Sequence, residues 1–275
     1  MILIAASKKD VASLNIAEKI LNHYNFERLK EKFDGNPIYE LKINNREVKL
    51  VTLNEESVYA QNITDFSPNI ELVVFISRHS SASGIPTLSV HTPGNLTGEA
   101  KLGGEPWKVS VSPANAMRYA LKVMEKLKEE KNLGYEVSYE CTHHGPSLNV
   151  PAMFTELGSS LEQWKDSKAA EAVAIATMEA VLNFKKDNVK VVLGIGGPHY
   201  NRKFSKLALN SEVAFGHMIP KYVIPNLKIE MLKQCIRKTM EKVECAVLDW
   251  KGIKGIYKNQ ILTMLEELGL PYEKV

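Results

Sequence analysis

Short apolar runs rich in Val and Ile recur along this chain and alternate with segments of helical pattern. The clearest runs are 2–6, 48–53, 71–77, 135–141 and 190–195. Near-continuous apolar runs of this length are typical of strands that are buried on both faces of a sheet. Helical patterns lie between and after them, at 10–22, 113–131, 167–184, 228–243 and 258–268. The alternation predicts an α/β fold, a three-layer α/β/α sandwich around a mixed, mostly parallel central sheet.

No repeat and no evident linker interrupts this alternation, so we expect a single domain over residues 1–275. A hydrophobic fraction of 44% and a charged fraction of 24% indicate a packed core and exclude a disordered or coiled-coil protein. No apolar stretch approaches the ~20 residues that span a bilayer, and the apolar start is too short for a signal sequence. Three cysteines without a paired spacing suit a reducing compartment. We therefore expect a cytoplasmic protein without a membrane partner, and a monomer.

The segment 80–113 is predicted as a long loop because it is rich in Gly, Pro, Ser and Thr. A loop of this length inside a compact domain is usually functional. We expect it to cover the active edge of the sheet.

Histidines cluster where predicted strands end. Those directly after strands are His79, the pair His143 and His144, and His199, while His91 and His217 lie in turn-like segments. Because the carboxyl ends of parallel strands meet at one edge of a sheet, these imidazoles are expected to converge. A single histidine in such a place is more often an ordinary polar residue. Several together can act as general bases near neutral pH or as zinc ligands.

The segment from Glu140 to His144 brings a carboxylate, a thiol and two imidazoles into succession. Alternate side chains of a strand share a face, so we expect Glu140 and His144 to be neighbours on one side. Cys141 and His143 would then face the other side. Glu140 could orient the His144 imidazole or bind a metal with it, and an ion pair with a lysine is the ordinary alternative.

The glycine-rich turn at 194–199 precedes a predicted helix at Asn201. It is neither a P-loop nor a dinucleotide fingerprint, because it lacks the Gly-Lys-Ser/Thr ending and the third glycine. A tight turn that presents His199 is the favoured interpretation.

Covalent catalysis by a side-chain nucleophile has little support. The chain has no GxSxG turn. The serines near the histidines are Ser147, Ser159 and Ser160, and serines in such loops more often cap or stabilise turns. Cys141 beside His143 could act as a nucleophile, but a cysteine within a strand is more often a small core residue.

Basic residues follow the long loop and the glycine turn, namely Lys101, Lys108, Arg118, Arg202 and Lys203. A solvated surface is their ordinary interpretation. Contacts with nucleic-acid phosphates would use these charges and would weaken as salt rises. A net charge of +3 and a pI near 8.5 permit a nucleic-acid partner without requiring one.

Several motifs together resemble one known family. They are SRHSS (77–81), HTPGN (91–95), THHGPS (142–147), TELGSS (155–160), a helix that begins near Trp164, and GIGGPHY (194–200). In order and spacing they resemble the D-aminoacyl-tRNA deacylases of archaea and plants. The similarity covers most of the chain up to at least His217, and THHGPS closely followed by TELGSS is its most specific part.

The resemblance implies an enzyme of translation quality control that hydrolyses the ester between a D-amino acid and the 3′ end of tRNA. D-tyrosine is the familiar amino acid, and the partner is the acceptor end of D-aminoacyl-tRNA. The resemblance also implies zinc dependence, with one or two Zn²⁺ per chain. It further implies an α/β/α fold related to purine nucleoside phosphorylase and peptidyl-tRNA hydrolase.

The roles of individual residues are our own hypothesis. We expect metal ligands at His79, His91, His143, His199 and His217. His144, oriented by Glu140, would be the general base, and Glu156 is an alternative base or ligand. Zinc held by histidines could lower the pKa of its water to about 7. The expected tRNA contacts are Lys101, Lys108, Arg118, Arg202 and Lys203.

Two other functions remain open from the sequence. A nucleoside phosphorylase-like protein, or another small-molecule hydrolase on the same fold, would not need an intact tRNA acceptor end. A non-catalytic RNA-binding protein would bind tRNA with a steep salt dependence and would be indifferent to chelators. The set of histidines argues against the second, and only the resemblance argues against the first.

Overall fold

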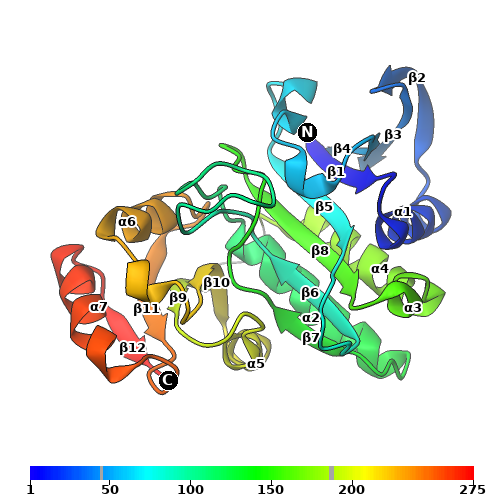
Figure 1. Ribbon diagram of the computed structural model, residues 1–275. Coiled ribbons are helices and arrows are strands. Elements are labelled where there is room, and N and C mark those ends of the chain that lie inside the picture. The colour runs from blue at the N-terminus through cyan, green and yellow to red at the C-terminus, as the bar shows by residue number, and fades with distance from the viewer. Residues whose placement is uncertain (44–45, 186–188) are drawn as a thin grey trace.

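The computed structural model describes residues 1–43, 46–185 and 189–275, and the strands in this part form two sheets (Figure 1). The strands of the larger sheet are β1 (Ile2–Ser7), β2 (Glu27–Phe33), β3 (Asn36–Ile43), β4 (Arg46–Leu53), β5 (Leu72–Arg78), β6 (Thr87–His91), β7 (Glu136–Tyr139) and β8 (Ala152–Gly158). Their order is β2-β3-β4-β1-β5-β8-β6-β7. The pairs β1–β4, β1–β5, β5–β8 and β6–β7 are parallel, whereas β2–β3, β3–β4 and β6–β8 are antiparallel. The predicted mixed, mostly parallel sheet is therefore confirmed.

The smaller sheet lies beside the larger one and was not predicted as a separate sheet (Figure 1). Its strands are β9 (Lys190–Ile195), β10 (Val213–Ile219), β11 (Val243–Leu248) and β12 (Tyr272–Lys274), in the order β10-β9-β11-β12 with parallel pairing throughout. The prediction that 190–195 belongs to one common central sheet was wrong. An apolar run marks a strand but does not specify which strand will pair with it.

Helices flank both sheets. Their bounds are α1 (Val11–His23), α2 (Ala114–Glu130), α3 (Leu161–Trp164), α4 (Ser167–Asn183), α5 (Arg202–Asn210), α6 (Ile229–Arg237) and α7 (Gly255–Glu267), with 3-10 turns η1 (Ser57–Tyr59), η2 (Ile63–Phe66) and η3 (Ile224–Asn226). The predicted helix at 228–243 ends at Arg237, because the chain must turn before β11 begins. Among the described residues, no helix combines the length and apolar character needed to cross a membrane.

The alternation of side chains along the strands divides the interior into separate layers. Ile4 and Val74 pack in the core beneath α1, α2 and α4, whereas Leu3 and Phe75 face the opposite side, where η1 and η2 lie. The core beneath the helices continues into the smaller sheet, since it also includes Phe215. One hydrophobic core therefore crosses from one sheet to the other.

The Ala-rich helix α4 occupies the centre of this core, as its nearly uniform apolar pattern predicts. Asp166 caps it by accepting hydrogen bonds from the N–H groups of Lys168 and Ala169 at 2.9 and 3.1 Å. Small side chains on α4 let α1 and α2 approach it closely. This packing holds the helical side of the larger sheet, and the polar groups described next lie on its other side.

Candidate active site

Buried polar side chains gather on the face of β8 that points away from the helices. Glu156 and Phe154 lie on this face, and the His91 ring stacks on Phe154 with centroids 5.0 Å apart and planes inclined by 6°. We expected the histidines to meet because the carboxyl ends of parallel strands lie at one edge of a mostly parallel sheet. Instead, β6 is antiparallel to β8, so its last residue, His91, is paired with Phe154 inside β8. Strand β7 is parallel to β6 and ends beside it.

His79 is fixed by the start of α1 and the end of β8. Asp10, which caps α1, also accepts a hydrogen bond from the Arg78 N–H at 2.6 Å. The His79 carbonyl accepts a hydrogen bond from Trp164 Nε1 at 2.8 Å. The Nε2 atom of the His79 ring lies 2.9 Å from Tyr200 Oη. A Cβ at Gly158 would lie 2.6 Å from His79 Cβ, so only glycine permits this close approach.

His143 and His144 both present Nε2 with its lone pair available. Their Nδ1–H groups donate to the carbonyls of Cys141 at 2.8 Å and Gly145 at 2.7 Å. A carbonyl can only accept, so Nδ1 carries the hydrogen in each neutral ring and Nε2 does not. His144 Nε2 lies 3.2 Å from His91 Nε2. His144 also has a positive φ of 44°, which turns the chain sharply after the strand.

Glu140 connects three of the histidines from a position that is only 1% exposed. Its Oε2 accepts a hydrogen bond from His199 Nε2 at 2.8 Å and lies 3.7 Å from His143 Nε2, and its Oε1 lies 3.2 Å from His79 Nδ1. The predicted pairing of Glu140 with His144 was therefore wrong, because β7 ends at Tyr139 and strict alternation stops there. His144 lies beside His91 instead.

The charges of the carboxylates and imidazoles are set by burial and by one another. Burial alone would raise the pKa of Glu140, but the positive charge of His79 and the hydrogen bond from His199 hold it well below its usual value. Burial raises the pKa of Glu156, and the Glu140 charge acts in the same direction. Burial would lower the pKa of His79, but the two carboxylates raise it above its ordinary value. The pKa values of the two carboxyl groups are therefore shifted in opposite directions, although both lie in one site.

The pKa values of three other imidazoles in the cluster are shifted downwards. Burial and the neighbouring histidines lower the pKa of His91 and of His143 well below the ordinary value. Burial lowers the pKa of His144 to about 4. Neutral imidazoles are the form that binds metal ions.

Within residues 1–43, 46–185 and 189–275, ligand atoms that lie within 4.8 Å of one another form three groups that could hold a metal ion. These are His91, His143 and His144; Glu140, His143 and His199; and His79, Glu140 and Glu156. His91 Nδ1 is buried without a hydrogen-bond partner, which indicates that this donor set is not complete in itself. Histidines that bind zinc usually donate the other ring N–H to a carbonyl or carboxylate, as His143 and His144 do here. The donors therefore fit a zinc ion.

The cluster opens into a cavity of about 530 Å³. Its lining includes the site residues His79, Glu140, His143, His144, Glu156 and His199, and it extends to Tyr59, Leu102 and Tyr200. The predicted 80–113 loop contributes Leu102. Part of that prediction was wrong, since 87–91 form β6, but residues beyond β6 do line the site.

His217 does not join the cluster, although its sequence context suggested a ligand. Its ring is fully buried, with Nδ1 3.1 Å from Thr142 Oγ1 and Nε2 3.1 Å from the Lys238 carbonyl. Both ring nitrogens are thus already bound by the protein. The predicted metal role of His217 was therefore wrong.

The predicted tRNA-binding cations occupy different environments. Arg118 is only 3% exposed and donates to the Ser211 carbonyl and the Glu212 carboxylate, so the prediction of a phosphate contact there was wrong. Helix amphipathicity explains this, because Arg118 lies on the inward face of α2. Lys108 and Lys203 form ion pairs with Glu105 and Asp249. Lys101 is well exposed beside Glu99.

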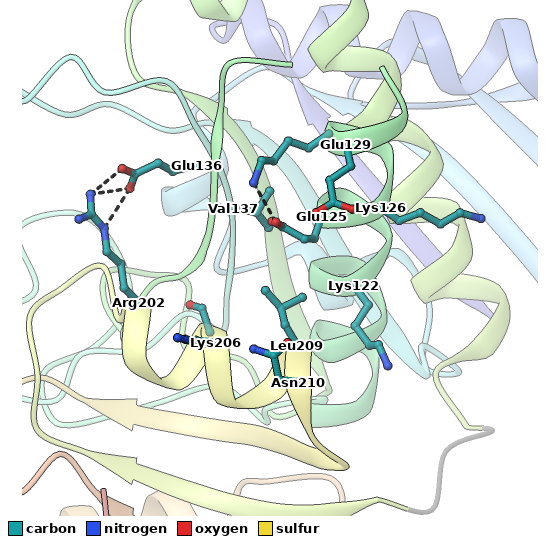
Figure 2. A pocket seen from close by; sticks show the side chains of 12 residues that line it. Lys122, Glu125, Lys126, Glu129, Glu136, Val137, Arg202, Lys206, Leu209 and Asn210 are labelled. Atoms are coloured by element: carbon teal, nitrogen blue, oxygen red, sulfur yellow. Dashed lines mark hydrogen bonds and ion pairs between the residues drawn. The ribbon is translucent and has the colours of Figure 1, made fainter. Parts of the chain in front are cut away.

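Arg202 lies at the rim of another cavity, of about 640 Å³, between α2 and α5 (Figure 2). Its guanidinium donates to both carboxylate oxygens of Glu136 at 2.6 and 2.7 Å. This cavity is lined by lysines, glutamates and no histidine. Its size therefore does not mark it as a catalytic site.

The alternative nucleophiles have structural roles. Cys141 is fully buried in the core beneath the helices, and burial raises the pKa of its thiol. Ser147 donates to the Lys108 carbonyl at 3.0 Å, Ser159 donates to the Ile85 carbonyl, and Ser160 caps α3. The expected capping and core functions are confirmed.

Three tyrosines near the cluster were not singled out from the sequence. Tyr200 contacts His79, Tyr222 Oη lies 3.2 Å from His199 Nδ1, and Tyr59 lines the cavity. Tyr200 adjoins His199 in the GIGGPHY motif and could have been found there. Nothing in the local sequence distinguishes Tyr59 or Tyr222.

Buried histidines and carboxylates that face a cavity place this chain in the class of α/β proteins whose site groups can act as acids and bases or hold a metal ion. A family model of D-aminoacyl-tRNA deacylases matches residues 66–273. The chain is 40% identical to the D-aminoacyl-tRNA deacylase of Pyrococcus abyssi, with 100% of both chains covered. It is 35% identical to that of Methanococcus maripaludis, with 99% of both covered. The chain therefore belongs to the D-aminoacyl-tRNA deacylase family.

One solved structure shares the whole fold. It is the crystal structure of a conserved protein of unknown function, with a TM-score of 0.88 and 29% identity. The similarity covers 100% of this chain and 95% of the other. Both sheets are thus part of one shared architecture.

Proposed function

We propose that this chain hydrolyses the ester bond between a D-amino acid and the 3′ end of tRNA, releasing the free D-amino acid and tRNA. Family membership supports the substrate. The observation that carries the chemistry is the Glu140–His199 pair, joined at 2.8 Å at the base of an open cavity. Hydrolysis of an ester needs an activated water, a polarised carbonyl and a stabilised oxyanion.

His199 is the general base in this proposal. Its Nε2–H donates to Glu140, so the lone pair lies on Nδ1, which faces Tyr222 Oη at 3.2 Å. The His199 side chain is 28% exposed and can contact a substrate, unlike buried His91. Nδ1 takes a proton from water as the water oxygen bonds to the ester carbon. The same proton passes to the ribose oxygen when the ester C–O bond breaks.

This assignment differs from our hypothesis from the sequence, in which His144 was the base. Glu140 orients His199 and lies beside His79, and it makes no hydrogen bond to His144. A carboxylate stabilises the imidazolium that forms during proton transfer only when it contacts that ring. His199 meets this condition.

Tyr200 can stabilise the negative charge that develops on the carbonyl oxygen. His79, protonated between two carboxylates, donates from Nε2 to Tyr200 Oη at 2.9 Å. This leaves the Tyr200 O–H free to donate into the cavity that it lines. A donor aimed at the developing oxyanion typically contributes about 10²–10³-fold in rate.

His91, His143 and His144 would hold a zinc ion. Three imidazoles are a common ligand set of catalytic zinc. Zinc would supply Lewis acidity to the ester carbonyl. Glu140, His143 and His199 are the alternative set, and the two sets can be separated by substitution. His144→Ala should reduce bound zinc under the first assignment, whereas His199→Ala should reduce it under the second.

The test is hydrolysis of D-Tyr-tRNA and L-Tyr-tRNA before and after treatment with a chelator, followed by zinc. Selective loss of the D-ester, abolished by the chelator and restored by zinc, is the expected result. Absence of hydrolysis above background for both esters would refute the proposed activity. Hydrolysis of the D-ester that resists the chelator would keep the activity and remove zinc from it.

A further inference from the structure

Three cavities follow one another across the surface next to the histidines. The site cavity and a neighbouring one of about 300 Å³ share Leu102, His143 and His144 in their linings. A third, of about 600 Å³, shares Thr97, Glu99 and Tyr222 with the second. We call the second and third cavities together the Tyr222 trough. It leads away from the cluster between the 94–107 segment and the 222–228 segment.

The two ends of this path differ in charge. The site cavity is lined by three carboxylates, Glu56, Glu140 and Glu156. The trough carries Lys101 and Lys228, and Glu99, its carboxylate, is paired with Lys101 at 3.3 Å. In the site cavity, Glu56 is paired with Arg78 at 3.1 Å and Glu140 with His79 at 3.2 Å, whereas the two lysines of the trough favour an anionic backbone there.

Aromatic rings line the trough between these cations. Tyr222 is 57% exposed although its ring is large. Trp107 lines the far end, where Lys228 Nζ lies 4.5 Å from the centre of its ring. Exposed aromatic rings interleaved with cations are the usual platform for unpaired nucleotides, whose bases stack and whose phosphates need positive charge.

Tyr222 is held firmly enough to serve as such a platform. Its neighbours Val223 and Ile224 are buried, and the Lys221 N–H donates to the Gly197 carbonyl at 2.9 Å. Its hydroxyl reaches His199 Nδ1. A base stacked on this ring would place the attached ribose next to the proposed general base.

We propose that the unpaired 3′ end of tRNA lies in the Tyr222 trough, with its terminal base stacked on Tyr222 and its phosphates near Lys101 and Lys228. The aminoacyl group then occupies the site cavity. This orientation rests on the proposed function, because it takes aminoacyl-tRNA as the substrate. It makes Tyr222 a binding residue that positions the ester.

The test uses a short fluorescent RNA ending in CCA, without an amino acid, titrated against Tyr222→Ala, Tyr222→Phe and Tyr59→Ala. Loss of the stacking ring in Tyr222→Ala should weaken binding about tenfold. Tyr222→Phe keeps the ring and should bind within about twofold of wild type. Tyr59→Ala removes another exposed tyrosine, which lines the site cavity but not the trough, and should bind like wild type.

Equal binding by wild type and Tyr222→Ala would overturn the proposal, as would a larger loss in Tyr59→Ala. The second result would mean that the RNA enters from the η1 side.

Lys228→Ala provides an independent measurement and should lower the salt dependence of binding by about one phosphate contact. An unchanged salt dependence would also count against the trough. These experiments measure RNA binding alone and do not depend on catalysis. Failure of the proposed activity would be seen in a different experiment, as the absence of D-Tyr-tRNA hydrolysis.

Discussion

His91 and His217 are both fully buried, yet their surroundings differ completely. His217 has a protein partner for each ring nitrogen, Thr142 Oγ1 and the Lys238 carbonyl. His91 has no hydrogen-bond partner for Nδ1, and its Nε2 faces another imidazole, that of His144, at 3.2 Å. A buried polar group normally finds its partners within the protein. The difference shows that incomplete hydrogen bonding, rather than burial, distinguishes His91, which we propose as a metal ligand, from His217.

The largest expected effect comes from Glu140→Gln, which removes the charge shared by three histidines while keeping the size of the side chain. Without it the His199 imidazolium loses its stabilising carboxylate, and kcat for D-Tyr-tRNA should fall about 10²–10⁴-fold. Steady-state deacylation measures this. Glu241→Gln is the matched control, since Glu241 caps α2 through the N–H groups of Ala114 and Asn115 outside the cluster. Equal losses in the two variants would contradict the role of Glu140.

Substitution of the two buried histidines by glutamine tests the comparison directly. His217→Gln should lower the free energy of unfolding by about 1–3 kcal/mol, because two buried partners lose a well-fitted ring. Its kcat should stay near that of wild type. His91→Gln should lose activity with little loss of stability, since it removes an unsatisfied buried nitrogen. Urea unfolding and deacylation of both variants give the result, and a stability loss in His91→Gln as large as that in His217→Gln would break the comparison.

The pH dependence of stability tests whether His217 is buried in its neutral form. Burial lowers the pKa of His217 to about 4, from 6.5 in the unfolded chain. Between these values only the unfolded chain binds the proton, so stability falls as pH drops through this window. The stability advantage of wild type over His217→Gln should shrink by about 2 kcal/mol at pH 5 relative to pH 7. Urea unfolding at both pH values measures this, and an unchanged difference would show that His217 titrates normally.

The smallest expected effect is on tRNA affinity and concerns Lys101 and Arg118, which the sequence analysis both predicted as tRNA contacts. Lys101→Ala should weaken tRNA binding a few-fold and reduce its salt dependence, because Lys101 is exposed next to the cluster. Arg118→Ala should leave tRNA affinity unchanged and lower stability instead, because Arg118 is buried against Ser211 and Glu212. Filter binding over a salt series, with thermal melting of both variants, distinguishes the outcomes. Weaker tRNA binding by Arg118→Ala at temperatures where it is folded would contradict this assignment.

Strands β1, β4, β5, β7 and β9, most helices and the cluster of histidines could be predicted because each depends on local sequence. Apolar runs identified β1, β5 and β9, and their following residues included His79 and His199. Pairing between distant strands is not encoded locally, so the second sheet and the antiparallel β6–β8 pair were missed.

The hydrogen bonds within the cluster also depend on contacts between residues that are far apart in the sequence. Glu140 and His199 are 59 residues apart, and an isolated antiparallel bridge between Glu140 and Tyr200 brings their two segments together. Tyr222 has no local motif, and its importance follows only from its place beside His199. His217 was misassigned because a histidine near glycine looks the same in sequence whether or not its ring nitrogens have partners.

The most direct test of the central claim is the zinc content of purified wild type, His143→Ala and His217→Gln, measured by elemental analysis after dialysis against zinc. His143 belongs to two of the three ligand groups, so its loss should abolish stoichiometric zinc if either of these two groups binds the ion. Wild type and His217→Gln should retain zinc, because the partners of His217 lie within the protein. Stoichiometric zinc in His143→Ala, or its loss in His217→Gln with a folded chain, would contradict the claim that incompletely bonded histidines form the site.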